Sequence, residues 1–158
     1  MNRLALSMLL SVCAVTFAAG DAFALPKFKT AFSDKYLKDH KDADFTKLAK
    51  KESCNACHLK GLKKKVANLN PYGKELSKLI EGDAKHRQDE AKAKGGKAAA
   101  DAELEVILKE LDKAFVAVAK VKSPTGDTYG ERIATAKLPV DPEVTKKAIA
   151  EAKAKEQR

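Results

Sequence analysis

The sequence has no tryptophan, and its six phenylalanines and three tyrosines leave any core poor in aromatic side chains. The two methionines are Met1 and Met8, so no thioether side chain is present after residue 24. The three cysteines are Cys13, Cys54 and Cys57. Any metal or cofactor site in the later part of the chain therefore has few sulfur ligands to draw on.

No segment alternates apolar and polar residues as a strand does, and no internal repeat is visible. Apolar residues recur at helical spacing instead, most clearly over 101–122, where they form one stripe. The sequence therefore predicts a small all-α domain. Its other expected helices contain Phe28, Phe32 and Tyr36; Phe45, Leu48 and Ala49, ahead of Cys54; Leu76, Leu79 and Ile80; Tyr129 and Ile133; and a last stretch that opens at Asp141 and Pro142.

Two further expectations concern how these helices are joined and packed. The sequence KAKGGKAAA, residues 92–100, is typical of a flexible connection between helices. The helix that leads into Cys54 is expected to pack against the stripe of 104–118. The segment 76–80 would lie close to both, with the space between them left for a cofactor.

The first 24 residues have the features of a secretory signal. Arg3 precedes the mostly apolar stretch Leu4–Ala19, which is short for a membrane span, and Ala22–Ala24 carries small residues where a signal peptidase reads them. We expect 1–24 to be a cleaved signal peptide, with an uncleaved anchor as the alternative. Residues 25–158 would form one exported domain with a flexible basic C-terminal tail, in the periplasm or elsewhere in a bacterial envelope.

Lysine supplies most of a formal net charge of +9, which favours acidic protein partners or an anionic membrane surface. Nucleic acid is not an expected partner, because export removes the chain from it and no stripe of arginine and aromatic residues is present. A solvated, lysine-rich surface without a partner is the simpler interpretation of the same charge.

The sequence CNACH places Cys54, Cys57 and His58 within five residues, and a basic loop follows. Cys-x-x-Cys-His in an exported protein is typical of covalent haem attachment. Each thiol adds to one vinyl group, and the two-residue spacing lets a single helical turn present both sulfurs to one edge of the haem. The imidazole of the next residue then faces the iron. We therefore expect one covalently bound haem c.

Three other interpretations of this motif stay open. A dithiol redox site would follow a strand in an α/β domain, whereas a helical pattern precedes Cys54. A zinc site would need a second pair of closely spaced ligands, and His40 and His86 stand alone. A structural disulfide between Cys54 and Cys57 is the third.

CNACH, then Gly61 and a basic loop, then NLNPYG, resemble the small monohaem c-type cytochromes. The resemblance covers about Phe28 to Ile80. It implies a cytochrome c-like helical domain wrapped around the covalent haem, with His58 as the proximal iron ligand. In that family a proline carbonyl commonly accepts the proximal Nδ1–H bond, and Pro71 could do so here. A plain turn proline is the alternative.

The family commonly uses methionine as its second axial ligand, which this chain lacks after residue 24. We expect His86 as a distal ligand, with His40, a lysine amine or Tyr129 as alternatives, and a vacant or water-bound position as another. Both histidines lie in polar stretches typical of surface histidines. Without methionine, the reduction potential should be lower than that of a His/Met cytochrome.

The resemblance implies a monomeric electron carrier, not an enzyme, that exchanges single electrons with acidic redox partners. Lys60, Lys63, Lys64 and Lys65 would form a positive rim that steers those partners. One alternative is a five-coordinate haem protein that senses a small ligand or reacts with peroxide. A non-haem secreted dithiol or disulfide protein is another.

Overall fold

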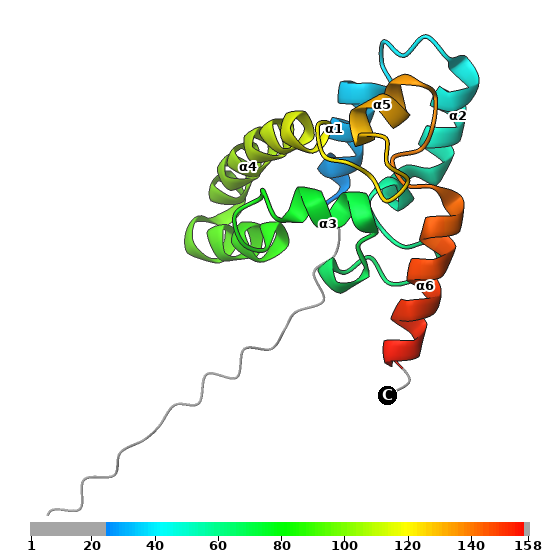
Figure 1. Ribbon diagram of the computed structural model, residues 1–158. Coiled ribbons are helices and arrows are strands. Elements are labelled where there is room, and N and C mark those ends of the chain that lie inside the picture. The colour runs from blue at the N-terminus through cyan, green and yellow to red at the C-terminus, as the bar shows by residue number, and fades with distance from the viewer. Residues whose placement is uncertain (1–24, 157–158) are drawn as a thin grey trace, which may run out of the picture.

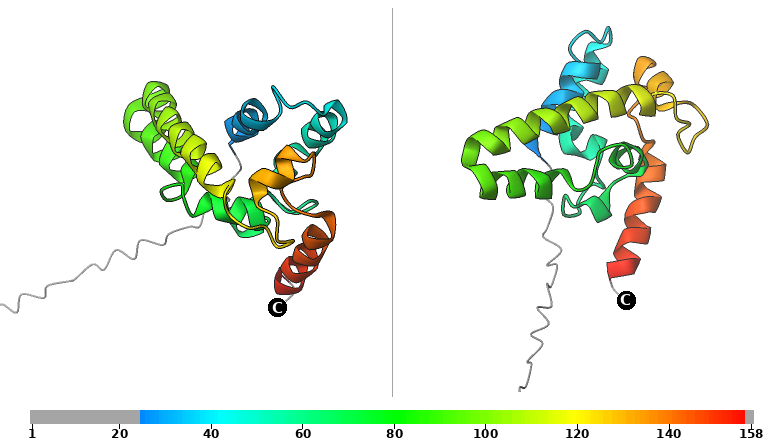
Figure 2. Two further views of the ribbon diagram at one scale, coloured as in Figure 1. Left: turned by 45° about the horizontal axis from the view of Figure 1, so that its top comes forward. Right: turned by 90° about the vertical axis from the view of Figure 1, so that its left-hand side faces the viewer.

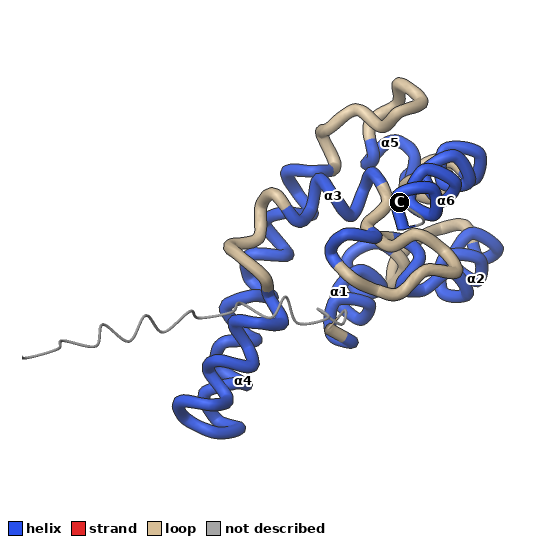
Figure 3. Tube along the Cα trace, turned by 90° about the horizontal axis from the view of Figure 1, so that it is seen from below, coloured by secondary structure: helices blue, strands red, loops and turns tan. Residues whose placement is uncertain are grey.

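The computed structural model describes residues 25–156, so the predicted signal peptide lies outside the described part. Its helices are α1 (Pro26–Tyr36), α2 (Ala43–Glu52), α3 (Pro71–Ser77), α4 (Ala84–Val118), α5 (Tyr129–Ala134) and α6 (Pro142–Glu156), shown in Figure 1. The 3-10 turns η1 (Ser53–Ala56) and η2 (Val66–Asn68) lie between α2 and α3. Within 25–156 there is no strand (Figure 3), so the all-α prediction is confirmed. No helix in this range is long and apolar enough to cross a membrane.

The long element α4 is a hairpin of two arms, which lie side by side in Figure 2. Gly95 and Gly96 leave the helical conformation, and Gly96 has a φ of 68°, which favours glycine. Arg87 in the first arm pairs with Glu103 at 2.7 Å and with Glu110 at 2.8 Å in the second. The connection predicted over 92–100 is therefore wrong in extent. The alanines and lysines around the two glycines favour helix, so only the glycines break it.

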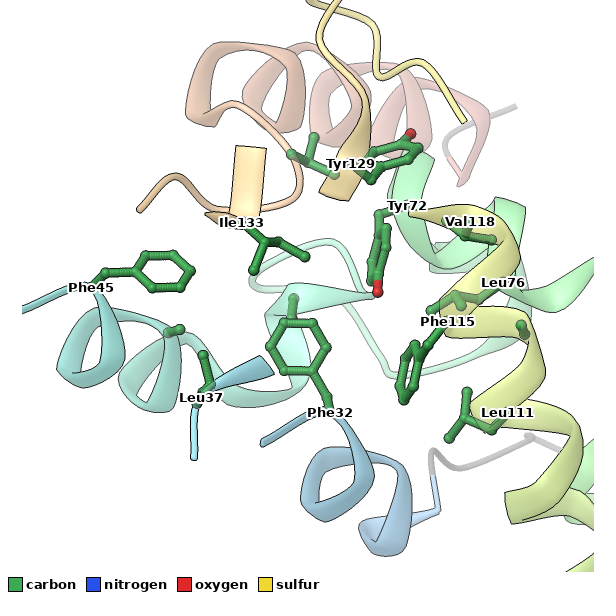
Figure 4. Close-up of a cluster of buried hydrophobic side chains, with 14 residues drawn as sticks. Phe32, Leu37, Phe45, Tyr72, Leu76, Leu111, Phe115, Val118, Tyr129 and Ile133 are labelled. Atoms are coloured by element: carbon green, nitrogen blue, oxygen red, sulfur yellow. The ribbon is translucent and has the colours of Figure 1, made fainter. Parts of the chain in front are cut away.

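The core lies where α1 and α3 pack against the second arm of α4. Phe32 and Tyr36 of α1 contact Phe115 of α4 with ring centroids 6.2 and 5.5 Å apart. Figure 4 shows Phe32 between Phe115 and Tyr72 of α3, which packs on it. We expected α2 to cover this face of α4. That expectation is wrong, because the aromatic side chains of α1 occupy it, although Phe45 of α2 joins the same core.

The C-terminal part of the chain follows the sequence pattern in part. The second arm of α4 ends at Val118, earlier than predicted, and the short helix expected around Tyr129 is α5. Asp141 Oδ1 accepts a hydrogen bond from the backbone N–H of Glu143, as expected for the cap that begins α6. The residues predicted to form a flexible tail are helical as far as Glu156.

Candidate functional site

A cavity of about 330 Å³ opens beside the Cys-x-x-Cys-His motif, within the range usual for small-ligand and cofactor sites. Its walls come from α1, η1, the α3 region and both arms of α4, so segments far apart in the sequence meet here. Most of the lining is apolar: it includes Leu25, Phe28, Phe32, Val66, Leu69, Leu76, Ile80, Leu111 and Phe115, together with Cys54, Cys57 and His58.

One tight turn presents both cysteines to this cavity, as their spacing predicts. Ser53 ends α2 with a φ of 50°, which turns the chain sharply into η1. The backbone N–H groups of Cys57 and His58 both donate to the carbonyl of Cys54, at 3.2 and 3.0 Å. Cys54 is exposed, Cys57 is half-buried, and both are free thiols. The three residues of the motif therefore lie together on one wall of the cavity.

His58 is 8% exposed, and its Nδ1 is enclosed by protein without a hydrogen-bond partner among the described residues. Burial and, to a lesser extent, the positive charge of Lys64 lower the pKa of His58 to about 4. The backbone groups of Lys65 and Asn68 oppose this shift, although neither meets the geometry of a hydrogen bond to Nδ1. The bond expected from the Pro71 carbonyl is absent, and Pro71 instead begins α3.

Two residues of the NPYG sequence hold the cysteine turn against α3. Asn70 is 1% exposed, and its Nδ2 donates to the carbonyls of Asn55 and Ala56, at 3.1 and 2.9 Å. Its Oδ1 accepts from the backbone N–H of Gly73, which caps α3. A Cβ on Gly73 would lie 2.1 Å from the Cys57 carbonyl oxygen, so only glycine allows this close approach. The Asn-Pro pair signals a helix start, but the sequence gives no sign of the bonds to the cysteine turn.

Polar side chains on both sides of the cysteine turn form a hydrogen-bonded network that the sequence did not predict. Asn55, one of the two residues between the cysteines, donates from Nδ2 to Glu52 at 3.2 Å. Its Oδ1 accepts a hydrogen bond of 2.5 Å from the Lys64 amine, which also donates to the Leu59 carbonyl at 3.1 Å. Lys60 pairs with Glu52 at 2.9 Å. Of the four lysines expected to form a positive rim, Lys60 is therefore bonded to the end of α2 and Lys64 to the loop of the motif.

The Cys57 thiol is the less exposed of the two. Burial raises the pKa of Cys57 to about 12, with a smaller contribution from Cys54. Cys57 is therefore held as the neutral thiol, and because a redox-active Cys-x-x-Cys pair needs only one reactive thiolate, the dithiol alternative stays open. In the described part of the chain, no three side chains of the His, Cys, Asp and Glu types gather as a metal site.

His86, His40 and Tyr129 do not line the cavity that contains His58. His86 is exposed and does not line the cavity, and its backbone N–H donates to the capping Asp83. The ring of His40 is held elsewhere: Nε2 bonds the Ile133 carbonyl at 2.9 Å, and Nδ1 accepts from the Asp42 N–H. Tyr129 is buried against Tyr72. The role of His86 as a distal ligand stays a prediction.

Two lysines, Lys29 and Lys85, line the cavity. Lys29 lies on α1, in the sequence between the cavity-lining Phe28 and Phe32. Lys85 lies in the first turn of α4 and is paired with Asp89. Sequence reasoning could not separate these two from the many other lysines, because the selection depends on how α1 and α4 meet.

No family model, curated protein or solved structure matches the chain.

The buried imidazole gives a prediction for the chain without any bound group. Because the pKa of His58 in the folded state lies below its ordinary value, the unfolded chain takes up a proton that the folded chain does not. The folded state therefore has its full stability from the neutral His58 ring above about pH 6.5, and it loses this contribution as the pH falls toward 4. We expect His58→Gln to remove on the order of 2 kcal/mol of this pH dependence, measured by urea unfolding at about pH 7 and about pH 4.5. If the free energy of unfolding changed equally with pH in the wild type and in His58→Gln, the burial of a neutral His58 ring would be contradicted.

Proposed function

We propose that the chain is a monohaem c-type cytochrome that carries single electrons, with haem bound covalently by Cys54 and Cys57 and the iron by His58. The observation that carries this proposal is the placement of two free thiols and a buried imidazole on one wall of an apolar cavity. Export, acidic redox partners and a monomeric state remain predictions.

The residues present fit this group. Each S–H would add across one vinyl double bond, with sulfur bonding one carbon and hydrogen the other, so that nothing is released. The Nδ1 of His58 faces the protein, which leaves Nε2, on the other side of the ring, for the cavity. Phe28, Phe32 and Leu111 would keep water from the macrocycle. When bound, haem would supply an iron that takes up one electron in going from the ferric to the ferrous state and releases it again.

A second candidate function rests on the placement of the other two histidines. Both ring nitrogens of His40 are bonded within the protein, and His86 is exposed outside the cavity lining. An iron held by His58 alone would bind a small neutral ligand, so the chain would then act as a sensor or as a peroxide-reactive catalyst. This candidate differs from an electron carrier in one direct measurement, the response to carbon monoxide.

The test is to express the chain with a c-type haem maturation system and examine it after denaturation. We expect haem to remain attached in the wild type and to be lost from the Cys54→Ser/Cys57→Ser double variant. His58→Gln should still attach haem but with an altered spectrum. A wild-type chain that is colourless after denaturation would overturn the proposal and favour a non-haem secreted protein.

The ferrous spectrum separates the two haem functions. A low-spin spectrum that carbon monoxide leaves unchanged would support the electron carrier, with a second ligand from the protein. Substituting His86, Lys29 and Lys85 one at a time would then identify that ligand. A high-spin spectrum that shifts with carbon monoxide would support the second candidate.

A further inference from the structure

The amine of Lys64 is held in one place beside the haem motif. Its Nζ donates to Asn55 Oδ1 at 2.5 Å and to the Leu59 carbonyl at 3.1 Å, and the residue is half-buried. Asn55 lies between the two cysteines and Leu59 follows His58 directly. Lys63, the preceding residue, is exposed. The two neighbouring lysines therefore carry the same charge in different settings, one fixed against the motif and one in solvent.

Lys64 forms no ion pair with a carboxylate among the described residues, although the charge of Glu52 acts on its amine. Glu52 is the nearby carboxylate, and it is paired with Lys60 at 2.9 Å. Asn55 links Glu52 to Lys64 but is itself neutral. The amine lies beside the segment that carries the imidazole, because it donates at 3.1 Å to the carbonyl of Leu59, the residue after His58. A charge that is half-buried and held by two hydrogen bonds is screened less than one on a mobile surface side chain.

We propose that Lys64 raises the reduction potential of the haem iron by placing a fixed positive charge beside its proximal ligand. This inference rests on the proposed function and names a residue that sets the reduction potential of the bound haem. Reduction lowers the charge of the iron by one, so a fixed cation stabilises the ferrous state relative to the ferric state. Lys64 would thus offset part of the low potential expected from the lack of a methionine ligand.

The test compares Lys64→Gln with Lys63→Gln in the haem-loaded protein, by redox titration against a mediator. Both variants lose one positive charge from the same loop. We expect Lys64→Gln to lower the equilibrium constant for reduction by about tenfold, which is about 59 mV for one electron, and Lys63→Gln to change it less than about twofold. Lys64→Arg keeps the charge and should stay within about twofold of the wild type.

Two results of this titration would overturn the inference. Equal shifts for Lys64→Gln and Lys63→Gln would mean that Lys64 acts only through the total charge of the loop. A shift for Lys64→Arg as large as that for Lys64→Gln would mean that the bonds to Asn55 and Leu59 matter, and not the charge.

A second measurement does not depend on haem. Amine acetylation of the haem-free chain, followed by peptide mass spectrometry, should modify Lys64 several-fold more slowly than Lys63. Equal rates would mean that the Lys64 amine is not held, and would overturn this inference while leaving covalent haem attachment intact. Failure to attach haem would overturn the proposed function, and with it this inference.

Discussion

Replacing Gly73 with alanine is expected to destabilise the chain by about 3 kcal/mol, although alanine is the better helix former. Gly73 lies in the first turn of α3 with an ordinary backbone conformation, so a side chain costs nothing in φ or ψ. The added Cβ would lie 2.1 Å from the carbonyl oxygen of Cys57. That oxygen accepts a hydrogen bond from the Asn70 N–H at 2.9 Å, so it cannot turn away freely. Either α3 or the cysteine turn must move.

Urea unfolding of the haem-free chain measures this effect, and Gly61→Ala is the matched control. Gly61 has a φ of 79° and open space where its Cβ would be, so its replacement costs only about 1 kcal/mol of backbone strain. Under the proposed function, Gly73→Ala should also lower the yield of covalently bound haem, since it shifts Cys57 relative to the cavity. If Gly73→Ala were no less stable than Gly61→Ala, α3 would not lie this close to the cysteine turn.

The parts of the fold that the sequence predicts are those decided by local pattern. The stripe of Ile107, Leu111 and Phe115 identifies the second arm of α4, and the Asp-Pro pair at 141–142 identifies the start of α6. The Cys-x-x-Cys-His spacing likewise predicts a single turn, because only adjacent residues are involved. Each of these features depends on side chains a few residues apart.

The parts that the sequence does not predict depend on how distant segments meet. Helical periodicity shows that α1 and α2 each have an apolar face, but not which of them covers Phe115. The polar setting of His40 suggests a surface histidine, whereas Ile133, far along the chain, binds its ring. For the same reason two neighbouring lysines of the basic loop behave differently: Lys64 is bonded to Asn55, and Lys63 is exposed.

Replacing Asn70 with aspartate is expected to destabilise the chain by about 3 kcal/mol at about pH 7. The two side chains have nearly the same shape, and the aspartate would keep the oxygen that accepts from Gly73. It would lose the Nδ2 that donates to the carbonyls of Asn55 and Ala56. A carboxylate oxygen would then face two carbonyl oxygens in a site that is 1% exposed. The loss is larger than one hydrogen bond, because a buried charge is left without a donor.

The pH dependence separates this cause from a general loss of packing. Burial and the facing carbonyls would raise the pKa of the introduced carboxyl above its unfolded value of about 3.9. The difference in unfolding free energy between wild type and variant should therefore be small near about pH 4 and grow as the pH rises toward about 7. Asp42→Ala, which removes the side chain that accepts from the Phe45 N–H, should cost about 1 kcal/mol at about pH 7. A deficit for the aspartate variant that did not change with pH would mean that the Asn70 amide does not hold the cysteine turn. Gly73 alone would then link NPYG to the Cys-x-x-Cys-His motif.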